Sequence, residues 1–185
     1  MRIVAGIYGG RKLHVPKGYD VRPTSDKVRG AVMNALASRG AIDGAVVLDV
    51  FCGTGALGLE ALSRGAAVCT FIDKARSSLD LARKNAADLG ADNAQFLLKE
   101  AQKISARPET QGPASLVFLD PPYNKGLIQA ALGALQEGGW FADEAMIVAE
   151  SEAELSLSCA GFRILDEKIY KDTKITYALY SGMSE

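Results

Sequence analysis

One histidine and three cysteines are all that this 185-residue sequence offers of the side chains that most often bind transition metals. A lone histidine, His14, gives no basis for a histidine-based catalytic triad or a multi-histidine metal site. Cys52, Cys69 and Cys159 are odd in number and widely spaced, so we expect neither a disulfide framework nor a CxxC zinc site. Cys69 and Cys159 are better interpreted as small buried hydrophobic residues, and we expect no metal.

Long apolar runs are also missing. No segment approaches the roughly 20 apolar residues that are needed to cross a bilayer. The first residues, Met1 to Gly6, lack the apolar core and the cleavage site of a signal peptide. We therefore expect a cytoplasmic protein without a membrane partner. Its composition is that of an ordinary globular protein, 48% hydrophobic and 23% charged.

A strong net charge is absent, since the formal total is −1 at pH 7. The charge is nevertheless unevenly distributed. Residues 1–39 contain eight Lys or Arg and two acidic residues, a net +6, whereas residues 40–185 contain thirteen basic and twenty acidic residues, a net −7. A basic head on an acidic body suggests that the head binds an anionic partner. The alternative is a terminus that is charged only because it is solvated.

The basic head predicts a hairpin and a helix. Apolar stretches separated by glycines indicate a β-hairpin within residues 1–15. After a proline-bounded loop, Thr24 or Ser25 can cap a helix whose apolar residues share one face. The chain length suits one domain, so we expect residues 1–39 to belong to the same domain as residues 40–185.

Strands and helices alternate from residue 45 to residue 150, which indicates an α/β fold with a mainly parallel sheet and helices on both faces. Continuous apolar runs predict buried strands, and spaced apolar residues predict amphipathic helices. The expected strands are 45–50, 67–73, 94–98, 115–120 and 145–150, with a closing antiparallel pair at 162–170 and 174–180; the expected helices are 53–64, 79–89 and 128–135.

A glycine-rich turn follows the first expected strand. Gly53-x-Gly55-x-x-Gly58 matches the dinucleotide fingerprint, and Asp73 lies about 20 residues further on, where a ribose-binding acid belongs. A nicotinamide dehydrogenase and an S-adenosylmethionine-dependent methyltransferase would both use such a turn. Asp49 favours the second, because a carboxylate repels a pyrophosphate but attracts the ammonium and sulfonium of S-adenosylmethionine. The alternative for Asp49 is a hydrogen bond to the backbone of the turn.

The end of the third expected strand carries a further acid, Glu100, followed by Ala101. An acidic side chain at this position can accept a hydrogen bond from an adenine amino group. It is equally consistent with an acid that is favoured at the start of a helix by the helix dipole. Both interpretations stay open.

Asp120-Pro121-Pro122-Tyr123 ends the fourth expected strand. Each proline fixes φ and removes an N–H donor, so this edge offers mainly acceptors: carbonyl groups and one carboxylate. The Asp120 carboxylate and the Pro121 carbonyl can receive the two N–H bonds of an amino group on a base. Two acceptors outside the ring plane favour a pyramidal nitrogen, and an ionised Asp120 stabilises the positive charge that builds there. Tyr123 can stack on the base, so these four residues are the expected catalytic loop.

Several blocks together resemble the bacterial 16S rRNA guanine-N2 methyltransferases of the RsmD-like family. They are the hairpin with Gly10-Arg11-Lys12-Leu13, the segment Arg22–Arg29, the segment Leu48–Ala66 and the catalytic loop. The resemblance covers almost the whole chain. It implies a Rossmann-like seven-stranded methyltransferase sheet that carries an N-terminal β-hairpin and helix.

The resemblance also implies a cofactor, a partner and roles for particular residues. The cofactor is S-adenosylmethionine, and the partner is 16S rRNA or the small ribosomal subunit particle. Separately from the resemblance, we expect a monomer. The residues expected to face RNA are Arg11, Lys12, Lys27 and Arg29. The residues expected to bind the cofactor are Asp49, Phe51, Gly53, Thr54, Gly55, Asp73, Lys74, Glu100, Ala101, Arg22 and Thr24.

Three alternatives remain at this stage. The first is an adenine-N6 methyltransferase acting on DNA or RNA, because the Asp-Pro-Pro-Tyr sequence does not separate two amino groups on rings. The second is a nicotinamide-dependent oxidoreductase that uses the turn from Gly53 to Gly58. The third is a non-catalytic RNA-binding protein that has kept only the fold.

Overall fold

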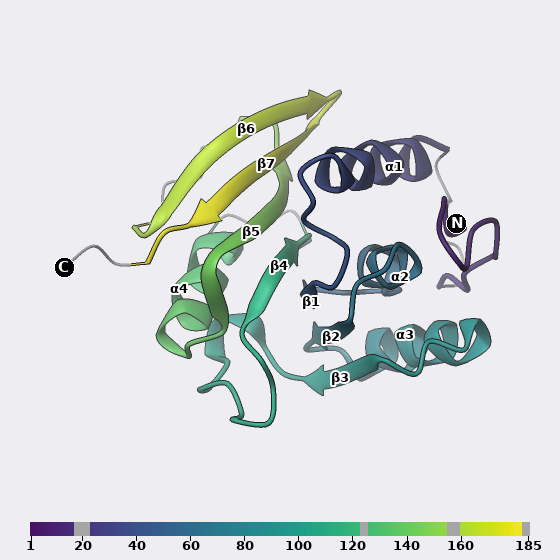
Figure 1. The fold of residues 1–185 in the computed structure, drawn as a ribbon, viewed down its shortest axis with the longest axis horizontal. Coiled ribbons are helices and arrows are strands. Elements are labelled where there is room, and N and C mark those ends of the chain that lie inside the picture. The colour runs from purple at the N-terminus through teal and green to yellow at the C-terminus, as the bar shows by residue number, and fades with distance from the viewer. Residues whose placement is uncertain (17–22, 123–125, 155–159, 183–185) are drawn as a thin grey trace.

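The computed structural model describes residues 1–16, 23–122, 126–154 and 160–182. Its centre is a seven-stranded sheet in the order β3-β2-β1-β4-β5-β7-β6 (Figure 1). The first five strands pair in parallel, and β7 pairs antiparallel with both β5 and β6. The strands are β1 (Val46–Val50), β2 (Val68–Asp73), β3 (Ala94–Leu98), β4 (Ala114–Leu119), β5 (Phe141–Glu152), β6 (Phe162–Tyr170) and β7 (Thr173–Tyr180).

Helices cover both faces of the sheet because alternate strand residues point to opposite sides. On one face, Val47, Phe71 and Phe118 pack with α1 (Pro23–Ala37), α2 (Ala56–Ser63) and α3 (Arg76–Leu89). On the other, Leu48 and Val117 pack with α4 (Leu127–Glu137). A short 3-10 helix, η1 (Ala101–Lys103), follows β3. Within the described ranges, no helix has both the length and the apolar character required to span a membrane.

The N-terminal head is tied to the body by one buried acid. Glu60 on α2 is fully buried and accepts hydrogen bonds from the backbone N–H groups of Val4 (2.7 Å) and Ala5 (3.0 Å). It also pairs with Arg64 at 2.9 Å and lies 3.6 Å from Arg29. A buried carboxylate is stable only when its lone pairs are satisfied in this way. The head is therefore continuous with the main core, as Ile3 and Leu13 in that core confirm.

The structure confirms the α/β fold with a mainly parallel sheet, and it corrects some boundaries. The hairpin at the N-terminus is reduced to a single bridge between Arg2 and Lys12. α2 begins at Ala56 and not at residue 53, because Gly53 and Gly55 adopt positive φ values of 53° and 77° that a helix does not allow. α1 begins at Pro23, where a proline is well tolerated in the first turn.

Candidate functional site

A cavity of about 1060 Å³ opens at the carboxyl ends of the central parallel strands. Its walls come from the loop after β1, the starts of α2 and α3, the ends of β4 and β5, the β6–β7 turn and α1. Ligands of open α/β sheets bind at this edge. The expected site residues that line the cavity are Asp49, Phe51, Gly53, Thr54, Asp120, Pro121 and Pro122.

The loop after β1 comes close to the cavity because its backbone is unusual. Phe51 has φ 64°, which is rare for a residue with a side chain, and Gly53 and Gly55 follow with positive φ. Strain of this kind concentrates at functional sites. Gly58 has a different role: a Cβ there would lie 2.4 Å from Phe71 Cε1 and 2.5 Å from Cys69 Sγ. The absence of a side chain at Gly58 lets α2 pack directly on β2.

Asp49 is almost completely buried beneath this loop, 1% exposed, and its Oδ2 accepts the Gly58 N–H at 2.9 Å. The turn-backbone interpretation is therefore correct for Asp49, and the residue also lines the cavity. Burial raises the pKa of Asp49 from 3.8 to about 7; the Gly58 hydrogen bond opposes this shift, and the negative charge of Asp73 adds to it. A cationic ligand above this carboxylate would favour its ionised form.

Asp73 supports the loop from the end of β2. Its Oδ2 accepts the Gly53 N–H at 3.1 Å, and its Oδ1 accepts the Ala75 N–H at 2.8 Å. Asp73 itself and four other expected cofactor residues, Gly55, Lys74, Glu100 and Ala101, lie outside the cavity wall. Lys74 is exposed, Ala101 is buried, and Glu100 forms an ion pair with Lys103 at 2.9 Å that lowers the pKa of Glu100.

Asp120 follows β4, and its side chain is exposed to the cavity. The surrounding protein displaces bulk water from its carboxylate, and Glu150 and Asp49 add negative charge, so the pKa of Asp120 lies above its ordinary value. Solvent in the cavity moderates this effect, because the group remains accessible. Pro121 is buried and Pro122 is exposed, and both line the cavity. Tyr123, the last residue of the expected catalytic loop, lies outside the described residues.

Two acids at the end of β5 were not recognised in the sequence. Glu150 is half-buried and Glu152 is exposed, and both line the cavity. Burial raises the pKa of Glu150. A signal was present, because the expected strand 145–150 ends in an acid, as do the expected strands 67–73 and 115–120. The β6–β7 turn, which also reaches the cavity, left no comparable signal.

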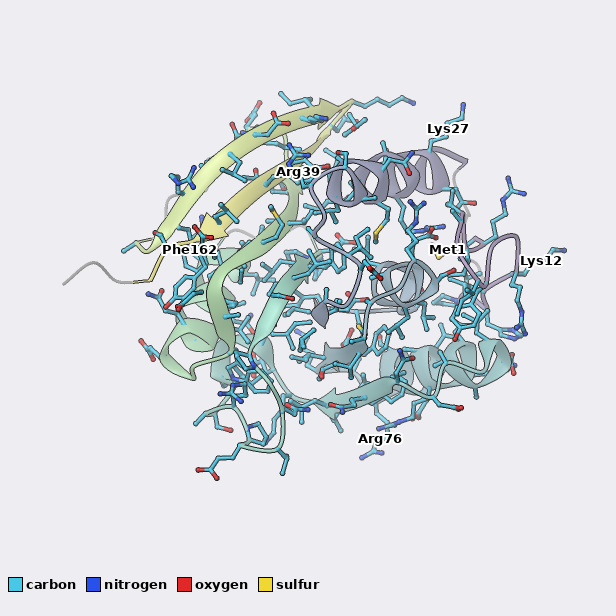
Figure 2. The ribbon with its side chains drawn as sticks, in the orientation of Figure 1. Met1, Lys12, Lys27, Arg39, Arg76 and Phe162 are labelled. Carbon is cyan, nitrogen blue, oxygen red and sulfur yellow. The ribbon has the colours of Figure 1, made fainter. Side chains whose placement is uncertain are left out.

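The basic residues of the head divide into two groups. Lys12 and Lys27 are exposed, and Figure 2 shows both side chains pointing away from the body, on the side where Met1 lies. Arg11 is also exposed, but it donates hydrogen bonds to the carbonyls of Leu89, at 3.1 Å, and Asp88, so it fixes the head to the end of α3. These three positions agree with a surface that is open to an anionic partner.

Arg29 differs from the expectation that it faces RNA. Its side chain is 5% exposed, pairs with Asp26 at 2.9 Å and donates to the Arg2 carbonyl. Its guanidinium also lies beside the buried Glu60. Because it is buried and paired, Arg29 stabilises the packing of α1 on α2. It also lines the cavity. Arg22 and the side chain of Thr24 lie outside the described residues.

A buried amide links the head to the glycine turn. Asn85 on α3 is 1% exposed and donates to the Thr54 carbonyl at 2.9 Å and to the His14 carbonyl at 3.1 Å. Its Oδ1 accepts the His14 N–H at 2.7 Å. Every polar group of the amide side chain is thereby engaged. The backbone after the hairpin and the loop that lines the cavity are thus held to one side chain.

The chain resembles known proteins over nearly its whole length. Residues 1–179 match the family described as Conserved hypothetical protein 95. Ribosomal RNA small subunit methyltransferase D of Escherichia coli (strain K12) is 42% identical over 182 residues, which cover 97% of this chain and 89% of that protein.

Solved structures show the same relationship. The putative methyltransferase yhhF from Escherichia coli has a TM-score of 0.86 at 38% sequence identity, and the match covers 99% of both chains. Magnesium protoporphyrin IX methyltransferase from Synechocystis, solved with bound SAM, has a TM-score of 0.67 at 18% identity, over 88% of this chain and 82% of that one. The second likeness is one of fold.

Proposed function

Because this chain belongs to the family described as Conserved hypothetical protein 95, we propose that it methylates the exocyclic N2 of a guanine in 16S rRNA of the small ribosomal subunit. The methyl donor is S-adenosylmethionine, in keeping with the methyltransferases to which the chain is similar. One observation carries the proposal: the acceptor-rich edge from Asp120 to Pro122 shares a cavity with Asp49 and the glycine turn.

The residues around the first strand end fit S-adenosylmethionine. When bound, it supplies an electrophilic methyl group on a sulfonium, and it carries a second positive charge on its α-ammonium. Asp49 and the other acids of the cavity complement these charges, whereas a pyrophosphate would meet repulsion from them. Asp73 accepts the Gly53 N–H of the glycine turn with Oδ2 and the Ala75 N–H with Oδ1, and each oxygen retains a lone pair for a ribose hydroxyl.

The edge at β4 prepares the amino nitrogen for transfer. The Asp120 carboxylate and the Pro121 carbonyl accept the two N–H bonds and turn the nitrogen lone pair toward the methyl group. Holding the nitrogen in this orientation removes much of the entropic part of the barrier. As positive charge builds on nitrogen, the carboxylate stabilises it, and Asp120 is then the nearest acceptor for the proton that must leave. Tyr123 completes the loop by stacking on the base.

This mechanism requires an ionised Asp120, although its surroundings in the free protein raise its pKa. Asp120 would return toward its ionised form beside a bound methyl donor, because the sulfonium and the α-ammonium would oppose the repulsion from Asp49 and Glu150. Cofactor binding thereby prepares the acceptor for the base. This order of events follows from the sign of the charges that surround the carboxylate.

The head supplies the contact to RNA. Exposed Lys12 and Lys27 together with Arg11 form a basic surface on a chain whose net charge is −1. Phosphate contacts of this kind give affinity but no sequence information. With so small a basic surface, a preassembled particle is a better substrate than a free strand. We therefore propose that the small-subunit particle is methylated in preference to naked 16S rRNA.

The test is methylation of small-subunit particles from a strain that lacks this protein, followed by mass-spectrometric mapping of the modified nucleotide. We expect N2-methylguanosine in 16S rRNA, and more product from particles than from naked rRNA. N6-methyladenosine as the product would overturn the choice of base. Calorimetric binding of NADH, with none of S-adenosylmethionine, would overturn the cofactor and favour an oxidoreductase.

A further inference from the structure

The sequence Asp-Pro-Pro at the end of β4 leaves the identity of the base open, because guanine N2 and adenine N6 are both ring-bound amino groups. A second acid stands beside it. Leu119 pairs with Ala149 in the parallel register of β4 and β5, so Asp120 and Glu150 follow at neighbouring positions on adjacent strands. Both line the same cavity, and each is close enough to affect the other's charge.

Glu150 differs from the other deeply placed acids in its hydrogen bonding. Glu60 is satisfied by two backbone N–H groups and by arginine. Asp49 receives the Gly58 N–H. For Glu150, the described part of the chain supplies neither an ion pair nor a hydrogen-bond donor to the side chain. A half-buried carboxylate beside a second acid, without a donor of its own, is unfavourable for folding and is typical of a site whose ligand supplies the donor.

The two bases differ in what they present beside the amino group. Guanine carries an N1–H donor next to its N2 amino group on the Watson–Crick edge. Adenine carries a bare N1, which is an acceptor, next to its N6 amino group. Enzymes that modify a base read this edge by hydrogen bonding after the base has left its stack. A carboxylate that flanks the amino-binding acceptors therefore attracts guanine and repels adenine.

We propose that Glu150 determines the choice of base by accepting the N1–H of the target guanine, while Asp120 and the Pro121 carbonyl accept the hydrogens of N2. This inference rests on the proposed function and names the group that gives it its specificity. The N1–H supplies the donor that the described residues do not offer to Glu150. Adenine would place a lone pair against the same carboxylate.

The test uses small-subunit particles reconstituted with ligated 16S rRNA that carries either guanine or 2-aminopurine at the mapped nucleotide. 2-Aminopurine keeps the amino group at C2 but has no N1–H. We expect the unaltered protein to prefer guanine in kcat/KM by about 10- to 100-fold, the usual range for one hydrogen bond to a charged group. In Glu150→Gln the preference should fall toward unity, because an amide can turn either its oxygen or its N–H toward N1.

Glu152→Gln is the matched control, since it removes one negative charge from the same strand and the same cavity at a position farther from Asp120. It should keep the preference for guanine. Thermal melting and calorimetry with S-adenosylmethionine establish that each variant is folded and binds the methyl donor.

The outcomes separate the two proposals. If the mapped product is not N2-methylguanosine, the proposed function fails before any variant is compared. If it is N2-methylguanosine, a Glu150→Gln protein with an unchanged preference overturns the role of Glu150 alone. The unaltered protein provides a second check that needs no variant: equal rates on guanine and 2-aminopurine would also overturn that role.

Discussion

In the proposed mechanism, Asp120 acts as a charged acceptor in surroundings that disfavour its charge. Its neighbours Glu150 and Asp49 are acids, and burial raises the pKa of all three carboxyl groups. Active sites often gather such groups, because a ligand of the opposite charge relieves the repulsion between them when it binds. The site therefore binds its cationic methyl donor and prepares its acceptor through the same charges.

Two substitutions at Asp120 separate its charge from its hydrogen-bonding oxygen. Asp120→Ala removes both and should lower kcat by about 10² to 10³-fold, the usual effect of losing one transition-state partner. Asp120→Asn keeps an acceptor oxygen and should lie between this variant and the unaltered protein. Single-turnover methylation of small-subunit particles measures both, and S-adenosylmethionine affinity by calorimetry is the control. Full activity of Asp120→Ala would exclude the mechanism.

Asp49 should destabilise the fold at neutral pH. Its folded pKa is about 7 against an ordinary 3.8, so the folded state holds its proton more tightly than the unfolded state. The contribution of Asp49 to the free energy of unfolding is therefore largest below about pH 4. It decreases as the pH rises, and it is fully lost above about pH 7. We therefore expect Asp49→Asn to melt at a higher temperature than the unaltered protein at pH 8, with a smaller difference at pH 5.5.

The gain from Asp49→Asn is at most a few kcal/mol, because the new amide N–H lacks an assigned acceptor. The same variant should bind S-adenosylmethionine more weakly, since a negative charge is lost beneath the ligand. The exposed Asp143→Asn serves as a control for surface charge. A melting difference that does not depend on pH would contradict the assigned burial effect.

At the scale of elements, the site depends on how closely α2 lies on β2. Gly58 sits where any Cβ would overlap the side chains of Phe71 and Cys69. This contact holds the start of α2, and with it the glycine turn, against the end of the sheet. Asn85 holds the same turn from α3 through the Thr54 carbonyl. The loop that lines the cavity is thus positioned by two helices, in addition to the conformation that its own glycines allow.

Gly58→Ala should destabilise the protein by about 1–3 kcal/mol, the usual cost of overpacking a core. Gly133→Ala is the matched control, since Gly133 lies inside α4 with no atom within 4 Å of the added Cβ. That change should instead stabilise the helix by roughly 0.5–1 kcal/mol. Urea unfolding of both variants gives the comparison. Equal changes in the free energy of unfolding would show that the close α2–β2 contact at Gly58 does not make this position intolerant of a side chain.

At the scale of the whole molecule, a small basic head is fixed rigidly to an acidic body. Glu60 binds its backbone, Arg29 packs beneath it, and Arg11 and Asn85 tie it to α3. A rigid head leaves Lys12 and Lys27 at defined positions on one side of the molecule (Figure 2). Phosphates bound there would orient the cavity relative to the RNA.

Lys12→Ala and Lys27→Ala should weaken binding to small-subunit particles and reduce its salt dependence. Each lost phosphate contact lowers the slope of log K against log salt by about 0.7–0.9. Arg163→Ala is the control and should leave the slope unchanged, because Arg163 is exposed and follows Phe162 in the chain, and Figure 2 shows Phe162 on the opposite side of the molecule from Lys12. Filter binding at several salt concentrations measures the slopes. Unchanged slopes in both lysine variants would assign RNA contact to another surface.

Much of the fold was predictable from local patterns. Buried apolar runs and helical periodicity depend on neighbours in the chain, so the alternation of strands and helices and the closing antiparallel pair were anticipated. The start of α2 was placed three residues early, because periodicity does not show that Gly53 and Gly55 take positive φ. In the head, the family resemblance implied that Arg29 faces RNA, and a sequence motif does not reveal a buried partner such as Glu60.

The sequence by itself determined the α/β class, the glycine turn and the acceptor edge at Asp120, because each depends on residues that are consecutive in the chain. Only the tertiary structure placed Glu150 beside Asp120, since the lateral order β1-β4-β5 brings together strand ends that are 30 residues apart. It also closed the cavity with the β6–β7 turn and buried Arg29. The proposed amino acceptor thus rests on local sequence, whereas the proposed choice of base rests on contacts between strands that only the tertiary structure creates.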